Sequence, residues 1–402
     1  MDAIYLTVLL LYSIFIAAMH AGLKRLMSPA GAELPRLSVI LPVRNEQNHI
    51  AACLASLAQQ TYPKELYEVT VIDDESSDGT AEQVEQWCRD HPNFQLVRKT
   101  TNAAFNGSPK KRAIQLGIEH SVGDLIITTD ADCRFSKNWL RCMAAAFSAE
   151  IGAVASWVHV PANGTLLSRV EELDSMSYSL VGAACIALGY PILANGANFA
   201  YRRQAYDQIG GFQGIDCLAS GDDDLLLQKL HQQGRWRIGF SDSSETIVTT
   251  RSCTGWKAFF QQRVRWASKS GVYKESVQAV LFVLFVLMLC YLSSLIMLIA
   301  QPTAARAALV VGKMVADYTL LRVVARKFGT TFRLSAFLTA ELVQAIYLPA
   351  IALWGALVGS FEWKDRRYRH GRIDAKNHPA KPIPSLSIPE PDHSMAGKLA
   401  QK

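Results

Sequence analysis

The pattern of hydrophobic and polar residues divides the chain into an apolar start, a mixed middle and an apolar end. Residues 3–19 carry no charge and are long enough to form most of a membrane anchor over residues 1–26. From residue 34 to about 250, short β-branched runs alternate with longer helical patterns. Residues 276–360 are again largely apolar, which predicts further membrane helices.

The middle region is expected to form a mostly parallel sheet with helices on both faces. Four short runs rich in β-branched residues have the length of buried strands, and most are followed by a helical pattern. This alternation implies right-handed crossovers and brings the carboxyl ends of the strands to one edge, where open α/β sheets bind ligands. The predicted strands are residues 37–41, 69–72, 94–97 and 125–129, and the predicted helices are residues 47–60, 81–89 and 109–120.

Acidic residues follow two of these strands. Asp73 and Asp74 end one strand, and Asp130 and Asp132 follow another, so four carboxylates are expected at the same edge. Their repulsion would be relieved by a divalent cation, a base edge or a ribose hydroxyl. Oxygen ligands of this kind suit Mg²⁺ or Mn²⁺. The alternatives are a simple strand-end turn at Asp130 and an Asx-type turn within residues 73–78 that caps the next helix.

A third acidic group, Asp222-Asp223-Asp224, opens an amphipathic helix after a glycine. The helix dipole favours acids at this position, so a helix cap is the alternative to a catalytic role. Three acids in a row exceed what a cap needs. A carboxylate here would suit a general base.

Further along, Gln262, Arg265 and Trp266 have the spacing i, i+3, i+4 and would share one face of a helix within residues 251–275. Guanidinium suits a diphosphate, and indole suits the face of a sugar. The alternative is an interfacial helix in which the arginine snorkels and the tryptophan anchors at the lipid headgroups.

Composition narrows the possible partners. The chain has 402 residues, 50% of them hydrophobic, and a net charge of +6. Much of the basic excess lies in residues 322–333 and 364–376, beside apolar segments, which indicates a membrane surface rather than nucleic acid. The eight cysteines form no Cys-x-x-Cys motif, as is typical of reduced thiols and unlike a zinc site or a disulfide framework.

Charges beside the apolar segments predict the orientation. Lys24 and Arg25 follow the first segment, which implies an outside amino terminus and a cytoplasmic catalytic region. An uncleaved anchor is expected, and a cleaved signal peptide is the alternative because alanines lie near His20.

Three carboxyl-terminal spans are expected, within residues 277–300, 309–324 and 334–358. The second contains Lys313 and Asp317, so it either packs against protein or lies in the interface. Three spans would leave the basic tail outside, in conflict with the positive-inside rule.

Five motifs resemble those of family 2 glycosyltransferases, in the membrane-embedded branch with the GT-A fold. They occur in the family's order and at roughly its spacing, over about residues 36–268. That branch includes chitin-oligosaccharide, hyaluronan and cellulose synthases and single-transfer enzymes that glycosylate ceramide or carotenoids. The motifs are SVILPVRNE, VIDDESSDGT, TTDADC, SGDDDLLL and QQRVRW.

The resemblance implies how the donor is bound. Asp73 and Asp74 would hold the uracil and ribose of a nucleotide sugar, most simply a UDP-sugar. Asp130 and Asp132 would bind the metal, with Asp130 also at the diphosphate. Lys110 would lie near the phosphates; the alternative is a solvated lysine at a helix start.

The resemblance also implies how the acceptor is activated. Asp223 would be the general base, with Asp222 as second candidate, because the family's acidic pair falls here on a triple aspartate and the register is open by one. Gln262, Arg265 and Trp266 would contact the donor beside the membrane.

These features together predict an inverting glycosyltransferase of the cytoplasmic membrane with a lipid or lipid-linked acceptor. One alternative is a polysaccharide or oligosaccharide synthase, although so few spans leave limited wall for a secretion channel. Another is a membrane-anchored nucleotide-sugar-binding subunit without turnover. The expected organisation is an anchor (1–26), a GT-A catalytic domain (34–250), an interfacial helix (251–275), membrane helices (276–360) and a basic, Pro-rich tail (361–402).

Overall fold

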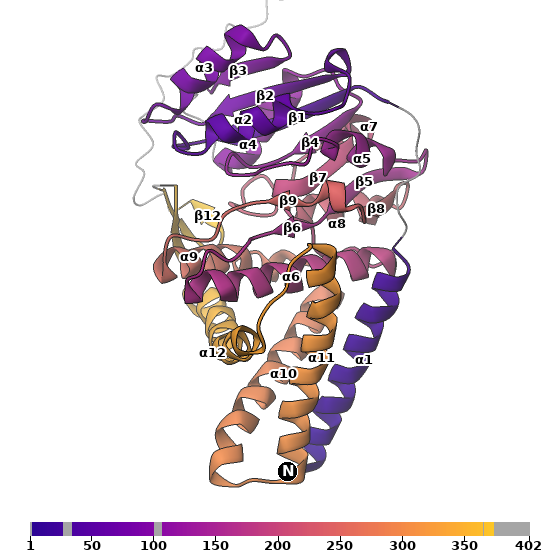
Figure 1. Cartoon of the computed structure of the whole chain (residues 1–402), viewed down its shortest axis with the longest axis vertical. Coiled ribbons are helices and arrows are strands. Elements are labelled where there is room, and N and C mark those ends of the chain that lie inside the picture. Colours follow the sequence, from indigo (N-terminus) through magenta and orange to yellow (C-terminus); the bar gives the residue numbers. More distant parts are fainter. Residues whose placement is uncertain (1, 27–33, 100–106, 365, 374–402) are drawn as a thin grey trace, which may run out of the picture.

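A computed structural model of the chain describes residues 2–26, 34–99, 107–364 and 366–373. It shows an α/β domain at one end of a group of long helices (Figure 1). The central sheet consists of β1 (Leu37–Val43), β2 (Tyr67–Asp73), β3 (Phe94–Arg98), β4 (Leu125–Thr128), β5 (Ile151–Ser156), β7 (Phe199–Arg202) and β8 (Arg237–Ser241).

The strand order is β3-β2-β1-β4-β7-β5-β8. The sheet is parallel except for β7, which runs antiparallel to both β4 and β5. A separate short pair joins β6 (Val158–His159) to β9 (Val248–Thr249) beside the sheet. The predicted parallel strands are therefore present, with one inserted antiparallel strand that the alternation of elements did not predict.

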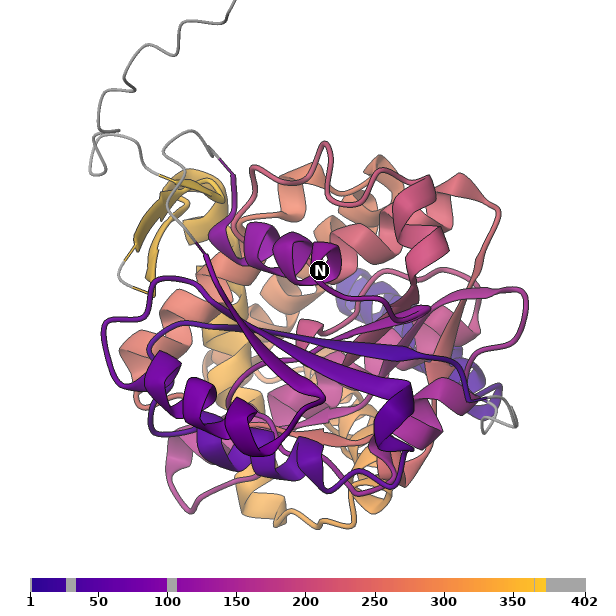
Figure 2. The same ribbon diagram turned by 90° about the horizontal axis from the view of Figure 1, so that it is seen from above.

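Helices cover both faces of the sheet (Figure 2). One face carries α2 (Ile50–Ala58), α3 (Thr80–Asp90) and α5 (Trp139–Ala145), and the other carries α4 (Pro109–Glu119), α7 (Arg203–Gln208) and α8 (Asp224–Gln233). Strand β1 shows the cause, because successive side chains point to opposite faces. Val39 and Leu41 pack on the α2 side, whereas Ile40 packs on the α4 side.

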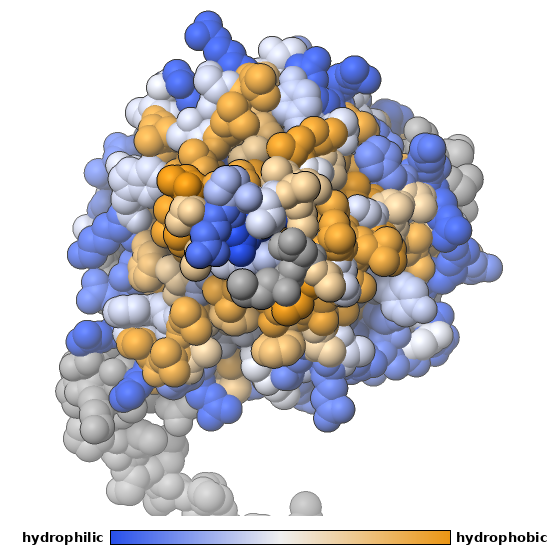
Figure 3. Space-filling view, turned by 90° about the horizontal axis from the view of Figure 1, so that it is seen from below, coloured by the Kyte–Doolittle hydropathy of each residue, from blue (hydrophilic) through white to orange (hydrophobic). Residues whose placement is uncertain are grey.

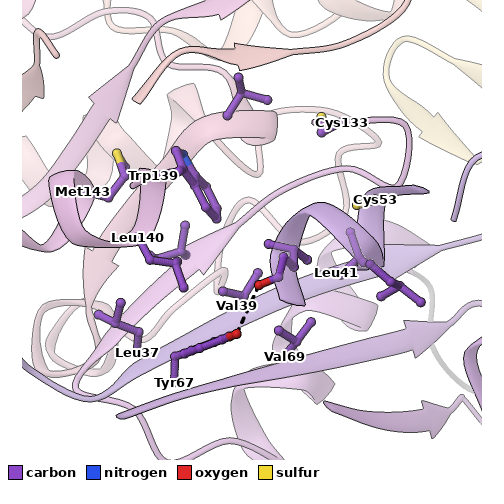
Figure 4. Packing of buried hydrophobic residues seen from close by; sticks show 14 of the residues in the cluster. Leu37, Val39, Leu41, Cys53, Tyr67, Val69, Cys133, Trp139, Leu140 and Met143 are labelled. Atoms are coloured by element: carbon purple, nitrogen blue, oxygen red, sulfur yellow. Dashed lines mark hydrogen bonds between the residues drawn. The ribbon is translucent and has the colours of Figure 1, made fainter. Parts of the chain in front are cut away.

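Figure 4 shows the core on the α2 side, where aliphatic residues of β1 and β2 meet Trp139 of α5. The Tyr67 hydroxyl is satisfied by donating to the Leu57 carbonyl oxygen at 3.1 Å. Burial raises the pKa of the Cys53 thiol, so this cysteine stays protonated. All eight cysteines are free thiols, as the sequence predicted.

The first predicted helix begins three residues late, at Ile50, because the chain before it is held by the loop after β2. The backbone N–H groups of Asn45 and Glu46 donate to the hydroxyls of Ser76 and Thr80 at 3.0 and 2.8 Å. These side-chain bonds satisfy backbone donors outside the helix and fix the two loops together at the sheet edge.

Three long helices run side by side away from the sheet: α1 (Asp2–Lys24), α10 (Glu275–Ala300) and α11 (Ala304–Lys327) (Figure 1). Between them and the sheet lie α6 (Leu166–Ala187) and α9 (Trp256–Ala267). Seen from below, hydrophobic residues surround a small hydrophilic patch on the side of the molecule opposite the sheet (Figure 3). By length and composition α1, α10 and α12 (Leu334–Leu357) can each cross a membrane.

Helix α12 nevertheless has a different direction. It is seen nearly end-on in Figure 1, while α1, α10 and α11 are seen lengthwise. It packs against α6, α9 and α10. Both of its ends therefore lie near the layer formed by α6 and α9.

The described residues after α12, up to residue 373, lie against the domain. They form an antiparallel sheet of β10 (Ser360–Trp363), β11 (Arg366–Arg369) and β12 (Arg372–Ile373), called here the C-terminal sheet. The sequence had assigned these residues to the basic tail; of that tail, residues 374–402 lie outside the described residues. The C-terminal sheet packs on α9 and lies on the same side of the long helices as the α/β domain.

Candidate active site

Most of the predicted site residues converge on one pocket of about 140 Å³ at the carboxyl edge of the sheet. The end of β4, the start of α8, α4 and α9 each contribute to it. Asp73 and Asp74 end β2, two strands away from β4 at the same edge, and are not among the lining residues. The predicted residues that line the pocket are Lys110, Asp130, Asp132, Asp222, Asp223, Gln262, Arg265 and Trp266.

The loop after β4 presents Asp130 and Asp132 to this pocket. The Asp132 carboxylate accepts a hydrogen bond from the Thr250 hydroxyl at 2.9 Å. Burial, and then the charge of Asp130, raises the pKa of Asp132. A divalent cation would remove this repulsion, so the pair fits Mg²⁺ or Mn²⁺ with water and phosphate as further ligands. Among the described residues no larger group of His, Cys, Asp or Glu side chains is placed to hold a metal.

Lys110 joins two of the acidic motifs. It follows Pro109 at the start of α4, and its ammonium lies 3.0 Å from carboxylate oxygens of both Asp130 and Asp222. Burial alone would lower the pKa of Lys110, but the two carboxylates outweigh it and raise that pKa. The side chain is thus a fixed positive charge between the end of β4 and the start of α8, rather than a solvated helix residue.

Asp223 is both a helix cap and a pocket residue. One carboxylate oxygen accepts from its neighbour Asp224 N–H at 2.7 Å, and the other accepts from Gly196 N–H at 3.0 Å. Although burial works to raise it, the pKa of Asp223 is lowered by Lys269, by the Asp224 N–H and by Lys110. Asp223 is therefore a carboxylate across the physiological pH range.

The third acid of the group lies behind the pocket. Asp224 is fully buried, 2.5 Å from the Lys269 ammonium, and accepts a hydrogen bond from the Tyr273 hydroxyl at 2.6 Å. Burial raises the pKa of Asp224 to about 6. Only Asp222 and Asp223 of the triple aspartate line the pocket, which narrows the open register to these two.

Gly196 brings the backbone close to the acidic group of the pocket. This residue begins the 3₁₀ helix η2 (Gly196–Asn198), which the Thr129 hydroxyl ties to the end of β4 through the Ala197 carbonyl oxygen at 2.9 Å. A Cβ at Gly196 would lie 2.9 Å from an Asp222 oxygen and 3.4 Å from the Lys110 nitrogen. A side chain at this position would therefore displace Asp222 from its place beside Lys110.

Two lysines of the site were missed by sequence reasoning. Lys269 neutralises Asp223 and Asp224, although nothing in its local sequence indicates an acidic partner. Lys111 is buried, and its ammonium donates to three backbone carbonyl oxygens of residues 215–220 at 2.6–2.9 Å, which fixes the loop before Asp222. Lys111 lies in the first turn of α4, where the helix dipole disfavours cations, and this unfavourable position was the sequence feature that could have indicated a special role.

The helical spacing selected Gln262, Arg265 and Trp266 on α9 but did not select Arg263, which supports this face of the helix. Arg263 is buried, forms an ion pair with Asp174 of α6, and has its guanidinium 4.4 Å from the Trp266 ring centre. Arg263 therefore packs against the ring of Trp266 and fixes its position. The Arg265 guanidinium lies 4.6 Å over the ring of Trp363 in the C-terminal sheet.

The carboxylates at and after the end of β2 differ in their partners. Asp73 accepts from the Ser76 N–H at 3.3 Å, and Asp78 caps α3 by accepting from the Thr80 N–H at 3.0 Å. The Asx-type turn is therefore present and uses these two acids. The Asp74 carboxylate takes no part in this turn. It forms ion pairs with Lys99 at 2.5 Å and Arg366 at 2.7 Å.

A second, larger cavity of about 850 Å³ lies below the acidic pocket, among α1, α6, α9, α10 and α12. Most of its lining side chains are apolar, such as Phe285 and Leu284. The two cavities share four lining residues at the level of α9: Tyr178, Arg263, Trp266 and Lys269. The apolar cavity therefore adjoins the acidic pocket at Lys269, the residue that neutralises Asp223.

The mostly parallel sheet, with acidic residues at the ends of its strands, has the GT-A fold. The chain belongs to glycosyl transferase family 21, whose model matches residues 5–374. That family is similar to family 2 and has the GT-A fold, which confirms the resemblance read from the five motifs.

Similar proteins include the "Probable glycosyltransferase YdaM" of Bacillus subtilis, 29% identical over 240 residues, which are 58% of this chain and 55% of that protein. The beta-monoglucosyldiacylglycerol synthase of Trichormus variabilis is 27% identical over 239 residues, 58% of this chain and 48% of that protein. The chain thus spans about half the length of these curated relatives.

Among solved structures, the mannosyltransferase PcManGT of Pyrobaculum calidifontis in complex with GDP-Man and Mn²⁺ has a TM-score of 0.56 at 21% identity. The match covers 86% of this chain and 96% of that one. It confirms the predicted GT-A class: a mostly parallel α/β sheet, with long apolar helices at both ends of the chain.

Proposed function

We propose that this glycosyltransferase transfers a sugar, with inversion, from a UDP-sugar to a hydroxyl of a membrane lipid or lipid-linked acceptor. The observation that carries the proposal is the apolar cavity between the long helices, which adjoins the acidic pocket at Trp266 and Lys269. Its volume lies within the roughly 300–1,000 Å³ of small-molecule sites, and its apolar lining suits acyl or isoprenoid chains. A lipid held there would present its polar end to Asp223.

The side chains of the acidic pocket then have distinct roles in the donor half of the reaction. Asp130 and Asp132 would hold Mg²⁺ or Mn²⁺, which when bound offsets the negative charge that develops on the departing diphosphate. Lys110, beside Asp130, adds a second positive charge at the phosphates without any proton transfer. Asp73 and Asp74 lie at the nucleoside end of the same sheet edge.

The acceptor half uses Asp223 as the base. Its low pKa keeps it ionised, and its two backbone N–H donors fix its orientation. As the acceptor oxygen attacks the anomeric carbon from the face opposite the diphosphate, its proton passes to a carboxylate. Asp222, held by Lys110, is the second candidate for this role. Gln262, Arg265 and Trp266 close the site above the cavity.

One kind of relative supports a lipid acceptor by its name, the beta-monoglucosyldiacylglycerol synthase already described. The polysaccharide synthase and the non-catalytic subunit remain the alternatives, and the assay below distinguishes all three.

For the membrane arrangement we propose that α1, α10 and α11 cross the bilayer and that α12 lies along its cytoplasmic side. The support is the C-terminal sheet, which reaches Asp74 and so requires an even number of crossings between α9 and β10. This arrangement puts residues 322–333, and the described residues of the second basic cluster (364 and 366–373), on the side of the catalytic domain. The conflict between three carboxyl-terminal spans and the positive-inside rule then disappears.

The test is incubation of the purified protein in nanodiscs with radiolabelled UDP-sugars, Mn²⁺ and a total lipid extract. A radiolabelled lipid product from the wild type and from Asp207→Asn, an exposed control on α7, but not from Asp223→Asn, supports the proposal. A water-soluble polymer would favour the synthase instead. Binding of donor without transfer or hydrolysis would favour the non-catalytic subunit.

A further inference from the structure

The C-terminal sheet, residues 360–373, is fastened to the site by its apolar side. Phe361 and Tyr368 are 2% and 1% exposed, stack at 5.1 Å between ring centres, and pack against Ala219 and Val264. The Ala219 N–H donates to the Gly371 carbonyl oxygen at 2.6 Å. Ala219 precedes the acidic loop and Val264 lies within α9, so this sheet is fixed to two elements of the acidic pocket.

The charged residues Lys364 and Arg366, at the turn between β10 and β11, reach the nucleoside end of the site; Arg366 shares the face of Tyr368, two residues further along β11. The Lys364 ammonium donates to the Arg44 carbonyl oxygen at 2.8 Å and pairs with Glu46 at the end of β1. The Arg366 guanidinium lies 2.7 Å from Asp74 and 3.2 Å from Glu75 at the end of β2.

Charge explains why these contacts matter for a donor. The ends of β1 and β2 carry Glu46, Asp73, Asp74 and Glu75 close together, and a nucleoside diphosphate is itself an anion. Without cations this edge would repel the donor. Four basic side chains pair with these acids, and the C-terminal sheet supplies two of them: Arg44, Lys99, Lys364 and Arg366.

Arg366 also fixes the direction of the Asp74 carboxylate. Its two guanidinium nitrogens approach both carboxylate oxygens, at 2.7 and 3.5 Å, while Lys99 holds one of them. A carboxylate has about four acceptor positions, and three are used here, so about one remains for a donor such as a ribose hydroxyl or a base N–H. The geometry of Asp74 is thus set before a nucleotide arrives.

We propose that the C-terminal sheet completes the donor site, with Arg366 as a positioning residue that acts through Asp74 on the nucleoside. This role rests on the proposed use of a nucleoside-diphosphate sugar. It deepens that proposal by assigning part of donor recognition to a segment that follows the last long helix.

The test measures binding of UDP and, separately, GDP to the full chain in nanodiscs with Mn²⁺, by isothermal titration calorimetry. Arg366→Ala is expected to raise the Kd of the bound nucleotide by roughly tenfold, the effect of losing one charge-assisted hydrogen bond. Arg366→Lys should recover part of the affinity. In an Asp74→Asn background Arg366→Ala should cause no further loss, because the arginine acts through Asp74.

The matched control is Arg369→Ala, on the same strand with its side chain exposed, which should bind as the wild type does. In steady-state assays Arg366→Ala should raise the donor KM and leave kcat and the acceptor KM unchanged; a general folding defect would move all three. Equal or tighter binding by Arg366→Ala, with normal wild-type binding, overturns this role alone. A wild type that binds neither nucleotide overturns the proposed function, and this role with it.

Discussion

Lys110 and Asp222 form an ion pair with 3.0 Å between nitrogen and oxygen, and the same ammonium lies 3.0 Å from Asp130. Two acidic motifs that are far apart in the sequence are thereby joined by one cation. The pairing explains how this many carboxylates share one pocket without strong repulsion. It also makes Lys110 the side chain on which the geometry of both motifs depends.

Replacing Lys110 should therefore impair turnover. Lys110→Met is expected to lower kcat by about 10²–10³, the usual effect of removing one preorganised group that stabilises charge in a transition state. The measurement is the initial rate of lipid product formation at saturating donor. Lys64→Met, at an exposed position, should retain the wild-type rate. A wild-type rate for Lys110→Met would contradict a role at the phosphates.

The two pocket-lining aspartates should differ in their effects. Asp223→Asn is expected to lower kcat by about 10²–10⁴, the usual contribution of a general base, with donor binding retained. Asp222→Asn should weaken the hold on Lys110 and reduce kcat less. Single-turnover rates of the two variants, compared at several acceptor concentrations, measure the difference. The reverse order would move the base assignment to Asp222.

The acidic strand ends were predictable because each follows a short apolar run, and parallel strands bring such ends to one edge. The cations that pair with them were not. Lys269 and Arg366 lie in segments whose local patterns indicate an interfacial helix and a tail, and only tertiary packing places them beside Asp223 and Asp74. Helical spacing likewise selected Gln262, Arg265 and Trp266 but passed over Arg263, whose partner is on α6.

The sequence also did not indicate the directions of two elements, β7 and α12. The period of hydrophobic residues does not indicate the direction of a strand, so the sequence did not show that β7, between β4 and β5, runs antiparallel to both. The apolar composition of α12 predicted a span. Its crosswise direction is a consequence of packing against α6 and α9, which composition does not report.

The acid side of the pH profile should depend on Lys269. This lysine is the main group that lowers the pKa of Asp223, while burial works in the opposite direction. In Lys269→Met burial should prevail, so the pKa of Asp223 rises and the base becomes protonated as the pH falls through a higher range. The acid limb of kcat/KM should therefore move to higher pH, whereas Lys269→Arg should leave it in place. An unshifted acid limb in Lys269→Met would show that Asp223 is not the titrating base.

Filling the apolar cavity should affect the acceptor alone. Leu284 of α10 lines the cavity away from the acidic pocket, and Leu284→Trp would occupy space otherwise open to a lipid chain. We expect a higher KM for the lipid acceptor and an unchanged rate of donor hydrolysis. Ile299→Trp, on the same helix at a position 89% exposed, is the matched control and should leave both values unchanged. An unchanged acceptor KM in Leu284→Trp would place the acceptor elsewhere.

The long helices are held together by a buried charged cluster that should govern stability. The Lys313 ammonium of α11 lies 2.6 Å from Asp317 and 2.5 Å from Glu341 of α12. Removing the cation leaves the buried Glu341 and the half-buried Asp317 without it, and breaking a buried pair in this way costs about 3–5 kcal/mol. Lys313→Met should therefore lower the melting temperature in nanodiscs by several degrees. Lys274→Met, at the exposed start of α10, should not. Adding Glu341→Gln and Asp317→Asn to Lys313→Met should recover part of the loss, because no charge then remains to be neutralised; a further decrease would mean that the carboxylates have other partners that this pairing does not include.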